Sequence, residues 1–358
     1  MSFGGGWRGP RGTPISAIGE FGLIARLRAI AERDHSRGEP SDEMLVLGIG
    51  DDAASLLPTP GREILITCDA QIAGRHFIPE WIAPRALGGR SIAVSASDIA
   101  AMGGLARAAL VSLAVGPEVA VEDLEDLYSG MVENLAPLHA ALIGGNVSGL
   151  DSGLVIDVTV IGEVESGRAI RRDGAQPGDR VWVTGAPGSA AAGLALLRSA
   201  GRRGIPPELE DLVAAYLTPT ARLREGRTLG LSGAVTSMID LSDGLIGDLT
   251  HMVEGRDTGV VLFEESLPVG ESLVRAAALL GRTPDSFILG PSDDYELVFT
   301  TTPVGAERAL EAVRGVSNVA VRQIGQVIAG GGGSVLIADA NGNRRPATGH
   351  GWNHFSAS

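Results

Sequence analysis

Short apolar runs alternate along this chain with segments in which apolar residues recur at helical spacing. The runs include 63–67, 106–115 and 154–164, and the helical segments include 84–102 and 121–136. The same alternation resumes after the middle of the chain and continues almost to its end. Strands that alternate with helices form sheets covered by helices. The pattern therefore predicts an α/β or α+β architecture in both halves.

A polar, turn-rich stretch over residues 165–180 separates the two halves. A chain of 358 residues is long enough for two domains, each with a sizeable core. We therefore predict an N-terminal domain over residues 16–166 and a C-terminal domain over residues 167–358. Residues 1–15, rich in Gly, Arg and Pro, are predicted to form a flexible tail. The glycines of 330–333 are predicted to form the tip of a hairpin.

Composition excludes several classes of partner. The formal net charge is −14, from 29 basic and 43 acidic residues, and such a surface does not attract nucleic acid or an anionic membrane. Neither an apolar signal segment at the start nor an apolar stretch long enough to span a bilayer is present in the sequence. The single cysteine, Cys68, excludes an internal disulfide. These features predict a cytoplasmic protein with no nucleic-acid or membrane partner.

The chain contains no lysine, so its 29 basic residues are all arginine. Without lysine, the P-loop lysine, the strand lysine of protein kinases and Schiff-base chemistry are all excluded. Any handling of phosphate by this chain must therefore use groups other than lysine.

Aspartates occur in five short turns, most of which follow an apolar run or lie on a helix of small residues. The turns are Gly48–Asp52, Thr67–Asp69, Ser95–Asp98, Asp240–Gly244 and Ser292–Glu296. Carboxylates that are brought together raise one another's pKa unless cations lie between them. Mg²⁺ prefers oxygen ligands and usually shares them with phosphate. The turns therefore indicate metal-assisted handling of a phosphorylated small molecule.

Three of these turns lie in the first half of the chain. Two glycines before Asp52 let the backbone turn sharply, although a solvated surface turn is an equally open interpretation. Thr67, Cys68 and Asp69 combine a hydroxyl, a main-chain carbonyl and a carboxylate at the end of a strand. Asp98 lies among small residues on a helix, which indicates close packing rather than a solvated face.

The turn Asp240–Gly244 joins a strand to a helix that is predicted over residues 243–254. Ser242 or Asp243 can be explained as the N-cap of that helix. Asp240 has no such local role. Because a helix N-terminus favours phosphate, the turn can hold metal and nucleotide together.

Four further residues are candidates for binding phosphate or metal. Gly144, Gly145 and Asn146 are predicted to end a strand, where a bare turn lets N–H groups approach a phosphate. Asn146 can donate to phosphate or offer its carbonyl oxygen to a metal. Arg172 is a candidate arginine clamp, and simple linker charge is an equally open interpretation.

Taken in order, these motifs resemble the thiamine-monophosphate kinase family, which belongs to the superfamily of aminoimidazole ribonucleotide synthetase. The resemblance covers the chain after residue 18. It rests on Gly19–Phe21, Gly48–Asp52, Asp69 with Gly74–Phe77, Ser97–Gly103, Gly144–Gly145, Ile239–Gly244, Asp294–Leu297 and His354–Phe355.

The resemblance implies ATP-dependent phosphorylation of thiamine monophosphate to thiamine diphosphate by direct, Mg²⁺-assisted in-line transfer. It also implies a homodimer in which the N-terminal sheets combine into a barrel, and a C-terminal domain with a mixed sheet and helices. By motif position, several Mg²⁺ ions would be held by Asp52, Thr67, the backbone of Cys68, Asp69, Asp98, Asp240 and Asp243. ATP would meet Gly145, Arg172 and Ser242, and His76 would contact the substrate.

The chain departs from the family pattern at three positions. Asn146 stands where the family usually has aspartate, and Asp293 stands where it has glutamate. Gly349 aligns with a substrate-stacking tryptophan of some members. Asp293 and Gly349 lie on the side expected to meet the thiamine moiety. Two alternatives therefore stay open: another ATP-using member of the superfamily with a different small phosphorylated substrate, and a catalytically silent nucleotide-binding protein.

Overall fold

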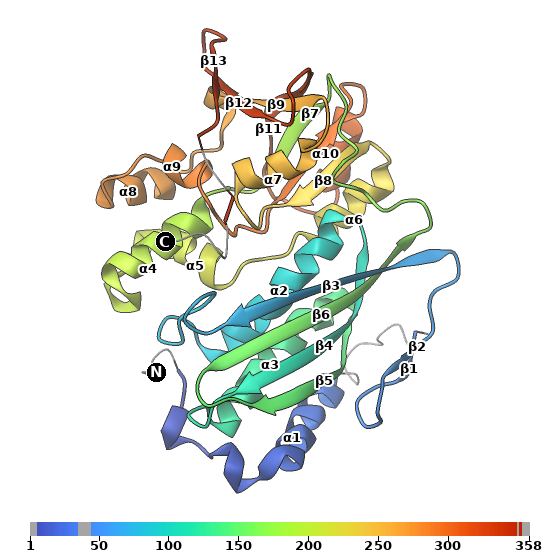
Figure 1. Ribbon diagram of the computed structural model, residues 1–358, viewed down its shortest axis with the longest axis vertical. Helices are drawn as coiled ribbons and strands as arrows, with labels where there is room; N and C mark the ends of the chain where they lie inside the picture. The colour runs from blue at the N-terminus through green and yellow to red at the C-terminus, as the bar shows by residue number, and fades with distance from the viewer. Residues whose placement is uncertain (1–5, 35–43, 349–350, 353–358) are drawn as a thin grey trace. The chain divides into compact units, whose positions relative to one another are not determined.

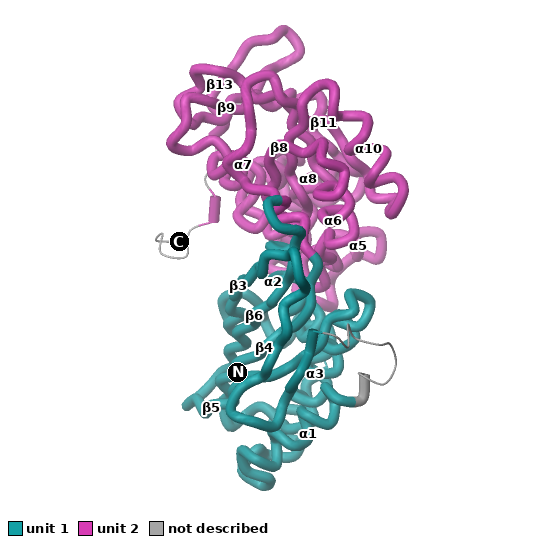
Figure 2. Tube along the Cα trace, turned by 90° about the vertical axis from the view of Figure 1, so that its right-hand side faces the viewer, with its two compact units in different colours: residues 1–99, 105–167 teal, residues 100–104, 168–358 magenta. Residues whose placement is uncertain are grey.

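The computed structural model of the protein describes residues 6–34, 44–348 and 351–352. The chain divides into two compact units, coloured separately in Figure 2: unit 1 is residues 1–99 and 105–167, and unit 2 is the remainder. Each unit has its own sheet and helices, which confirms the predicted mixed α/β architecture. No helix within the described ranges is long and apolar enough to cross a bilayer.

Unit 1 contains a four-stranded sheet with the order β3-β6-β4-β5. Its strands and helices are α1 (Gly19–Asp34), β1 (Leu45–Leu47), β2 (Ser55–Leu56), β3 (Arg62–Ile72), α2 (Pro84–Ala101), β4 (Leu105–Val115), α3 (Val121–Leu135), β5 (Ala141–Gly149) and β6 (Leu154–Glu165). Strand β6 is antiparallel to both β3 and β4, and β4 is parallel to β5. Helices α2 and α3 cover one face of this sheet (Figure 1).

Side chains of β3 alternate between the two faces of this sheet, as they must in any strand. The 67, 69 and 71 positions face α2, because Thr67 bonds Asp98 and Gln71 bonds Arg90 on that helix. The even-numbered positions face the other way, and Ile66 there is 69% exposed. The alternation places Thr67 and Asp69 together on the helix-covered face.

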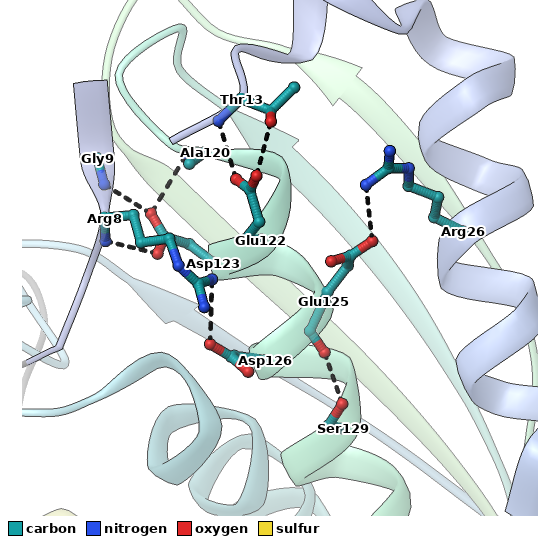
Figure 3. Close-up of polar contacts among 10 residues, drawn as sticks. All are labelled: Arg8, Gly9, Thr13, Arg26, Ala120, Glu122, Asp123, Glu125, Asp126 and Ser129. Atoms are coloured by element: carbon teal, nitrogen blue, oxygen red, sulfur yellow. Dashed lines mark hydrogen bonds and ion pairs between the residues drawn. The ribbon is translucent and has the colours of Figure 1, made fainter. Parts of the chain in front are cut away.

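The described part of the predicted flexible tail, residues 6–15, is anchored on the start of α3 (Figure 3). The carboxylate of Asp123 is buried and accepts the backbone N–H groups of Arg8 and the following glycine, at 2.7 and 2.9 Å. Glu122 accepts both the N–H and the hydroxyl of Thr13. This segment is therefore attached to unit 1 rather than free. The first five residues of the predicted tail lie outside the described residues.

Unit 2 contains a seven-stranded mixed sheet with the order β13-β12-β9-β11-β7-β10-β8. Its strands and helices are β7 (Arg180–Thr184), α4 (Ser189–Ala200), α5 (Glu210–Leu217), α6 (Leu223–Ser232), β8 (Val235–Asp240), α7 (Leu245–Val253), β9 (Thr258–Phe263), α8 (Glu271–Leu279), α9 (Asp285–Ile288), β10 (Leu297–Thr301), α10 (Ala306–Arg314), β11 (Val321–Ala329), β12 (Val335–Ala338) and β13 (Arg344–Pro346). The predicted hairpin at 330–333 is wrong, because the strands that these glycines connect, β11 and β12, lie on either side of β9.

The ends of three neighbouring strands lie together at one end of the unit 2 sheet. Strand β10 is antiparallel to both β7 and β8. The end of β7 at Thr184, the start of β10 at Leu297 and the end of β8 at Asp240 therefore lie side by side, with Leu297 paired to Asp240. The turns that leave these strands gather at this end.

Candidate active site

Thr67, Asp69 and Asp98 come together in unit 1. Strand β3 supplies the first two, and α2 supplies Asp98 from the helix that covers this face of the sheet. The Thr67 hydroxyl donates a short hydrogen bond to Asp98 Oδ2. The small residues around Asp98 let α2 lie close to the sheet, since the hydroxyl of Ser95 reaches the carbonyl of Val158 on β6 at 3.1 Å. The structure thus brings together residues from two of the predicted turns.

Within the described residues, no cationic side chain is among the groups that shift the pKa of Asp69. Burial, and then the charge of Asp98, raises the pKa of Asp69 to about 6, while the Ser95 hydroxyl lowers it. Burial also raises the pKa of Asp98. Among the described residues, the buried oxygen Asp69 Oδ2 has no hydrogen-bond partner. An unpartnered carboxylate oxygen beside a second carboxylate and a hydroxyl fits a hard divalent cation, which accepts oxygen ligands.

The side chain of Cys68 points to the opposite, open face of the sheet, where it is exposed. Its thiol donates to Asp157 Oδ1 at 2.9 Å and accepts from Thr159 at 3.4 Å. The hydrogen bond to Asp157 raises the pKa of this thiol. The role of the Cys68 backbone as a metal ligand stays a prediction. The sequence analysis missed Asp157, whose charge also raises the pKa of Asp69; its place in the alternating run of 154–164 was the available signal.

Asp52 is exposed and lies in a turn where its N–H bonds the side chain of Asp51. Asp52 is not among the residues whose charges raise the pKa of Asp69. Within the part of the chain that the structure describes, no three His, Cys, Asp or Glu side chains lie together in an arrangement suited to a metal ion. The complete predicted ligand set thus remains a prediction, and the structure brings together only part of it.

In unit 2, the turn after β8 carries Asp240, Ser242 and Asp243. Asp240 is buried at the strand end, whereas Ser242 is exposed and the side chain of Asp243 is partly exposed. The N–H of Leu241 donates to the carbonyl of Glu296 at 2.8 Å, which fixes the turn to the start of β10. The turn precedes α7, whose first residue is Leu245, so Asp243 lies before the helix rather than in it.

The side chain of Asp248 stabilises this turn through hydrogen bonds, and the sequence analysis did not identify this residue. This residue of α7 is 1% exposed, and its Oδ2 accepts the N–H groups of Asp243 and Gly244 at 3.1 and 3.0 Å. Burial and the charges of Asp240 and Asp243 raise its pKa well above the ordinary value. A carboxylate one helical turn after a predicted N-terminus was the available signal.

Gly145 and Asn146 lie within β5, which extends to Gly149, so the prediction that they end a strand is wrong. Gly145 is paired with Val111 on β4, and a Cβ atom on it would lie 1.9 Å from the Val111 carbonyl oxygen. Close strand packing therefore explains the glycine. Asn146 is exposed, and its amide donates to the Ser148 hydroxyl at 2.9 Å. Their contact with ATP or metal stays a prediction.

Arg172 lies on a segment that runs along the free edge of β8. The carbonyl of Arg172 accepts the hydroxyl of buried Ser237 at 2.8 Å, and the carbonyl of Arg171 accepts the N–H of Met238. A Cβ atom on Gly174 would lie 1.9 Å from the carbonyl oxygen of Thr236. The segment is therefore held against the strand that ends in Asp240, while the side chain of Arg172 is exposed.

The three residues predicted to meet the substrate are differently placed. The Nδ1 of His76 accepts the N–H of Ile72 at 3.0 Å, so His76 lies in the turn that follows β3 in unit 1. Asp293 is partly exposed in unit 2, in the segment before β10. Gly349 lies outside the described residues. The two described candidates thus belong to different units, and each remains a prediction.

Comparison with known proteins gives one family. Residues 50–164 match the AIR synthase related protein, N-terminal domain, and residues 176–338 match the AIR synthase related protein, C-terminal domain. A thiamine-monophosphate kinase of Escherichia coli strain K12 is 36% identical over 95% of this chain and 99% of its own length.

Solved structures agree with this. The crystal structure of the thiamine-monophosphate kinase from Stenotrophomonas maltophilia K279a is 29% identical, with a TM-score of 0.74 over 89% of this chain and 96% of its own. A structure of AaThiL complexed with AMPPCP and TMP is 28% identical, with a TM-score of 0.72 over 95% of this chain and 98% of its own. The chain therefore belongs to the thiamine-monophosphate kinase family of AIR synthase related proteins.

Proposed function

We propose that this protein phosphorylates thiamine monophosphate at the expense of ATP and so forms thiamine diphosphate. The observation that carries the proposal is the group of Thr67, Asp69 and Asp98, in which a buried carboxylate oxygen has no partner among the described residues. Family membership supports both co-substrates, because the related AaThiL was solved with AMPPCP and TMP. We further propose that the reaction takes place in the cytoplasm.

The reaction is a direct in-line transfer. An oxygen of the acceptor phosphate forms a bond to the γ-phosphorus of ATP while the bond from that phosphorus to the ADP oxygen breaks. This step needs no covalent intermediate on the enzyme, so the residues of this chain bind and orient the two phosphate groups. Arg172 and Ser242 would bind the phosphates of ATP together with Gly145 and Asn146. His76 and Asp293 would hold the phosphorylated acceptor.

Mg²⁺ fits the oxygen ligands that the two units offer. In unit 1 these are the Thr67 hydroxyl, Asp69 and Asp98, and in unit 2 they are Asp240 and Asp243; Asp52, the Cys68 backbone and Asn146 complete the proposed set. When bound, the ions neutralise the charge of the crowded phosphate groups. The carboxylates of Asp69 and Asp98 would then ionise fully, because a cation offsets both the burial and the repulsion from Asp98 that raise the pKa of Asp69.

We also propose a homodimer formed through the open face of the unit 1 sheet, with the sheets of two copies closing a barrel. On β3, which is an edge strand, the side chains of Ile64, Ile66 and Ile72 are exposed on that face. Contiguous exposed apolar side chains mark association surfaces. Light scattering on the purified protein and on Ile66→Glu tests this: the wild type should have twice the mass of the chain, and the variant should be a monomer.

Turnover tests the proposed reaction. Purified protein with ATP, Mg²⁺ and thiamine monophosphate should release ADP and thiamine diphosphate, both followed by chromatography. A panel of other small phosphorylated acceptors should give no ADP. Activity on another acceptor, with none on thiamine monophosphate, would assign the protein to a different reaction of the superfamily. Nucleotide binding without turnover of any acceptor would identify a silent nucleotide-binding protein.

A further inference from the structure

A loop over residues 73–83 joins β3 to α2 in unit 1 and carries His76, one of the two residues proposed to hold the phosphorylated acceptor. The first half of this loop is a tight turn that is hydrogen-bonded to the sheet. The N–H of Ala73 donates to the carbonyl of Leu154 on β6 at 2.9 Å. The N–H of His76 donates to the carbonyl of Ile72, the last residue of β3, also at 2.9 Å. The two strands therefore fix the start of the loop.

The second half of the loop is bonded to the start of the described chain. The indole Nε1–H of Trp7 donates to the carbonyl of Ile82 at 2.8 Å. Both residues are buried, with 3% of Trp7 and 2% of Ile82 exposed. The preceding residue also lies against the loop, because a Cβ atom on Gly6 would be 3.6 Å from the Cβ of Ala83. A tryptophan from outside the loop therefore fixes its end, just before α2 begins.

Trp7 is itself fixed by the residues that follow it. We call residues 6–14 the N-terminal strap, which is hydrogen-bonded to the start of α3 (Figure 3). Gly12 of the strap packs so closely there that a Cβ atom on it would lie 2.5 Å from the Cβ of Ala120, the residue before this helix. The N-terminal strap therefore connects the start of α3 to the end of the loop.

The N-terminal strap lies before Gly19, where the motifs of the family resemblance begin. Chain termini are poorly ordered unless they are tied down, and here the buried indole and the hydrogen bonds to α3 provide the attachment. Both ends of the loop are thus fixed by other parts of unit 1. A loop that is fixed at both ends has fewer conformations, so less entropy is lost when it binds a ligand.

We infer that Trp7 is a positioning residue for the transfer reaction. Through the carbonyl of Ile82 it restricts the loop of residues 73–83, and the restricted loop presents His76 to the phosphorylated acceptor. The inference rests on the proposed function, in which His76 holds that acceptor, and extends it to a segment outside the motif series. The indole is buried and bonded to the loop, so it acts through the loop rather than on the substrate.

Trp7→Ala removes both the indole N–H and the buried ring, and so releases the end of the loop. We expect the KM for thiamine monophosphate to rise about 10-fold, while kcat falls less than about threefold and the KM for ATP stays within about twofold. A residue that only stabilised the fold would lower the active fraction, and hence the apparent kcat, but would leave both KM values unchanged. An unchanged KM for thiamine monophosphate in folded Trp7→Ala overturns the inference.

Arg8→Ala is the matched control, because it changes the neighbouring residue of the same strap. The side chain of Arg8 is exposed and forms an ion pair with Asp126 at 3.4 Å, and surface pairs of this kind contribute little to stability. The backbone N–H of this residue, which donates to Asp123, is retained. Both KM values and kcat should equal those of the wild type. A rise in KM as large as that of Trp7→Ala would contradict the assignment to Trp7.

Trp7→Phe keeps an aromatic ring in the buried site but removes the N–H donor to Ile82. The KM for thiamine monophosphate should rise about 2- to 4-fold, because the carbonyl of Ile82 loses a hydrogen bond whereas most of the packing remains. This variant keeps the inference testable if Trp7→Ala does not fold, which circular dichroism will show. A wild-type KM in Trp7→Phe would refute the role of the hydrogen bond.

Hydrogen exchange on the full-length protein separates this inference from the proposed function. The N–H groups of Gly74, His76 and Trp81 are hydrogen-bonded, so their exchange reports whether the loop is ordered. In Trp7→Ala they should exchange at least ~10-fold faster than in the wild type, whereas the amides of β4 should not change. Faster exchange supports the restriction of the loop even if thiamine monophosphate is not turned over and the proposed reaction fails. Unchanged exchange overturns the inference while the reaction stands.

Discussion

The two carboxylate groups of this protein are held in different ways. In unit 1, Asp69 and Asp98 come from a strand and a helix, and Asp69 keeps an unpartnered buried oxygen and a pKa of about 6. In unit 2, Asp240 and Asp243 belong to one turn, whose N–H groups are accepted by Asp248. The first group is destabilised by burial and by the repulsion between its own carboxylates, whereas the second is ordered by hydrogen bonds from its backbone to Asp248. The difference predicts that the two groups differ in their dependence on backbone hydrogen bonds, metal and pH.

The largest expected effect is on turnover, and it should be common to both groups. Asp98→Asn and Asp240→Asn should each lower kcat at least ~100-fold, because each removes an electrostatic contribution of about 3 kcal/mol to the transition state. Steady-state kinetics with saturating ATP and Mg²⁺ measure this, and circular dichroism verifies the fold. Asp151→Asn, at an exposed position in the turn between β5 and β6, is the matched control and should retain most activity. Nearly wild-type rates in both variants would refute the metal assignment.

Variants of Asp248 test whether the Asp240–Gly244 turn is ordered by the hydrogen bonds that Asp248 accepts or by its negative charge. Asp248→Ala removes the acceptor of two N–H groups and should lower kcat about 10-fold and the free energy of unfolding by about 1–3 kcal/mol. Asp248→Asn keeps an acceptor oxygen and should retain activity within about threefold. Kinetics at several Mg²⁺ concentrations, with urea unfolding, check both variants. Equal losses in the two variants would show that the negative charge of Asp248, rather than its acceptor oxygen, is what the turn requires.

The carboxylates of unit 1 should make the free energy of unfolding depend on pH. The folded-state pKa of Asp69, about 6, lies above the ordinary value of 3.8, so ionisation of this group favours unfolding. Its contribution to stability is complete below pH 3.8 and is lost as the pH rises through about 6. In EDTA, the free energy of unfolding should therefore fall by about 1–3 kcal/mol from this group over that window.

Urea unfolding at intervals from pH 4 to 7 measures this loss. In Asp69→Asn the fall should be smaller, though still present, because burial also raises the pKa of Asp294 to about 6. Mg²⁺ should stabilise the wild type at pH 7 and stabilise Asp69→Asn less. A variant with the same pH profile as the wild type would mean that Asp69 does not carry the unbalanced charge.

Local pattern was sufficient to predict part of this molecule. The alternation of runs predicted mixed α/β units, and the apolar run before Asp240 predicted a strand end there, as found. Alternation along β3 was also sufficient in principle to place Thr67 and Asp69 on one face and the side chain of Cys68 on the other. These features are determined by residues that are close to one another in the sequence, so the local pattern of residues is sufficient to predict them.

Features that depend on contacts with backbone far away in the sequence could not be predicted from local pattern. Strand order placed β9 between β11 and β12, which the glycines of 330–333 could not reveal. Gly145 is explained by the Val111 carbonyl of the neighbouring strand, and a pocket beside Arg222 is lined by residues of α4, of α5 and of the segment before β10. Each of these features is caused by a contact between elements that are far apart in the sequence. The pattern of apolar residues in either element does not show which other element it contacts.

The smallest expected effect concerns Arg172. The position of this residue depends on the packing of its segment against β8 and on neither carboxylate group. In Gly174→Ala the added Cβ would lie 1.9 Å from the Thr236 carbonyl oxygen, so the segment must move away from the strand. We expect the KM for ATP to rise about 3- to 5-fold, with a loss of about 1–3 kcal/mol in the free energy of unfolding. Gly270→Ala is the matched control, because a Cβ there meets nothing within 4 Å and the backbone has φ of −81°. If Gly174→Ala lowers stability but leaves the KM for ATP unchanged, Arg172 does not bind the nucleotide, and the proposed binding of ATP in unit 2 must depend on the Asp240–Gly244 turn.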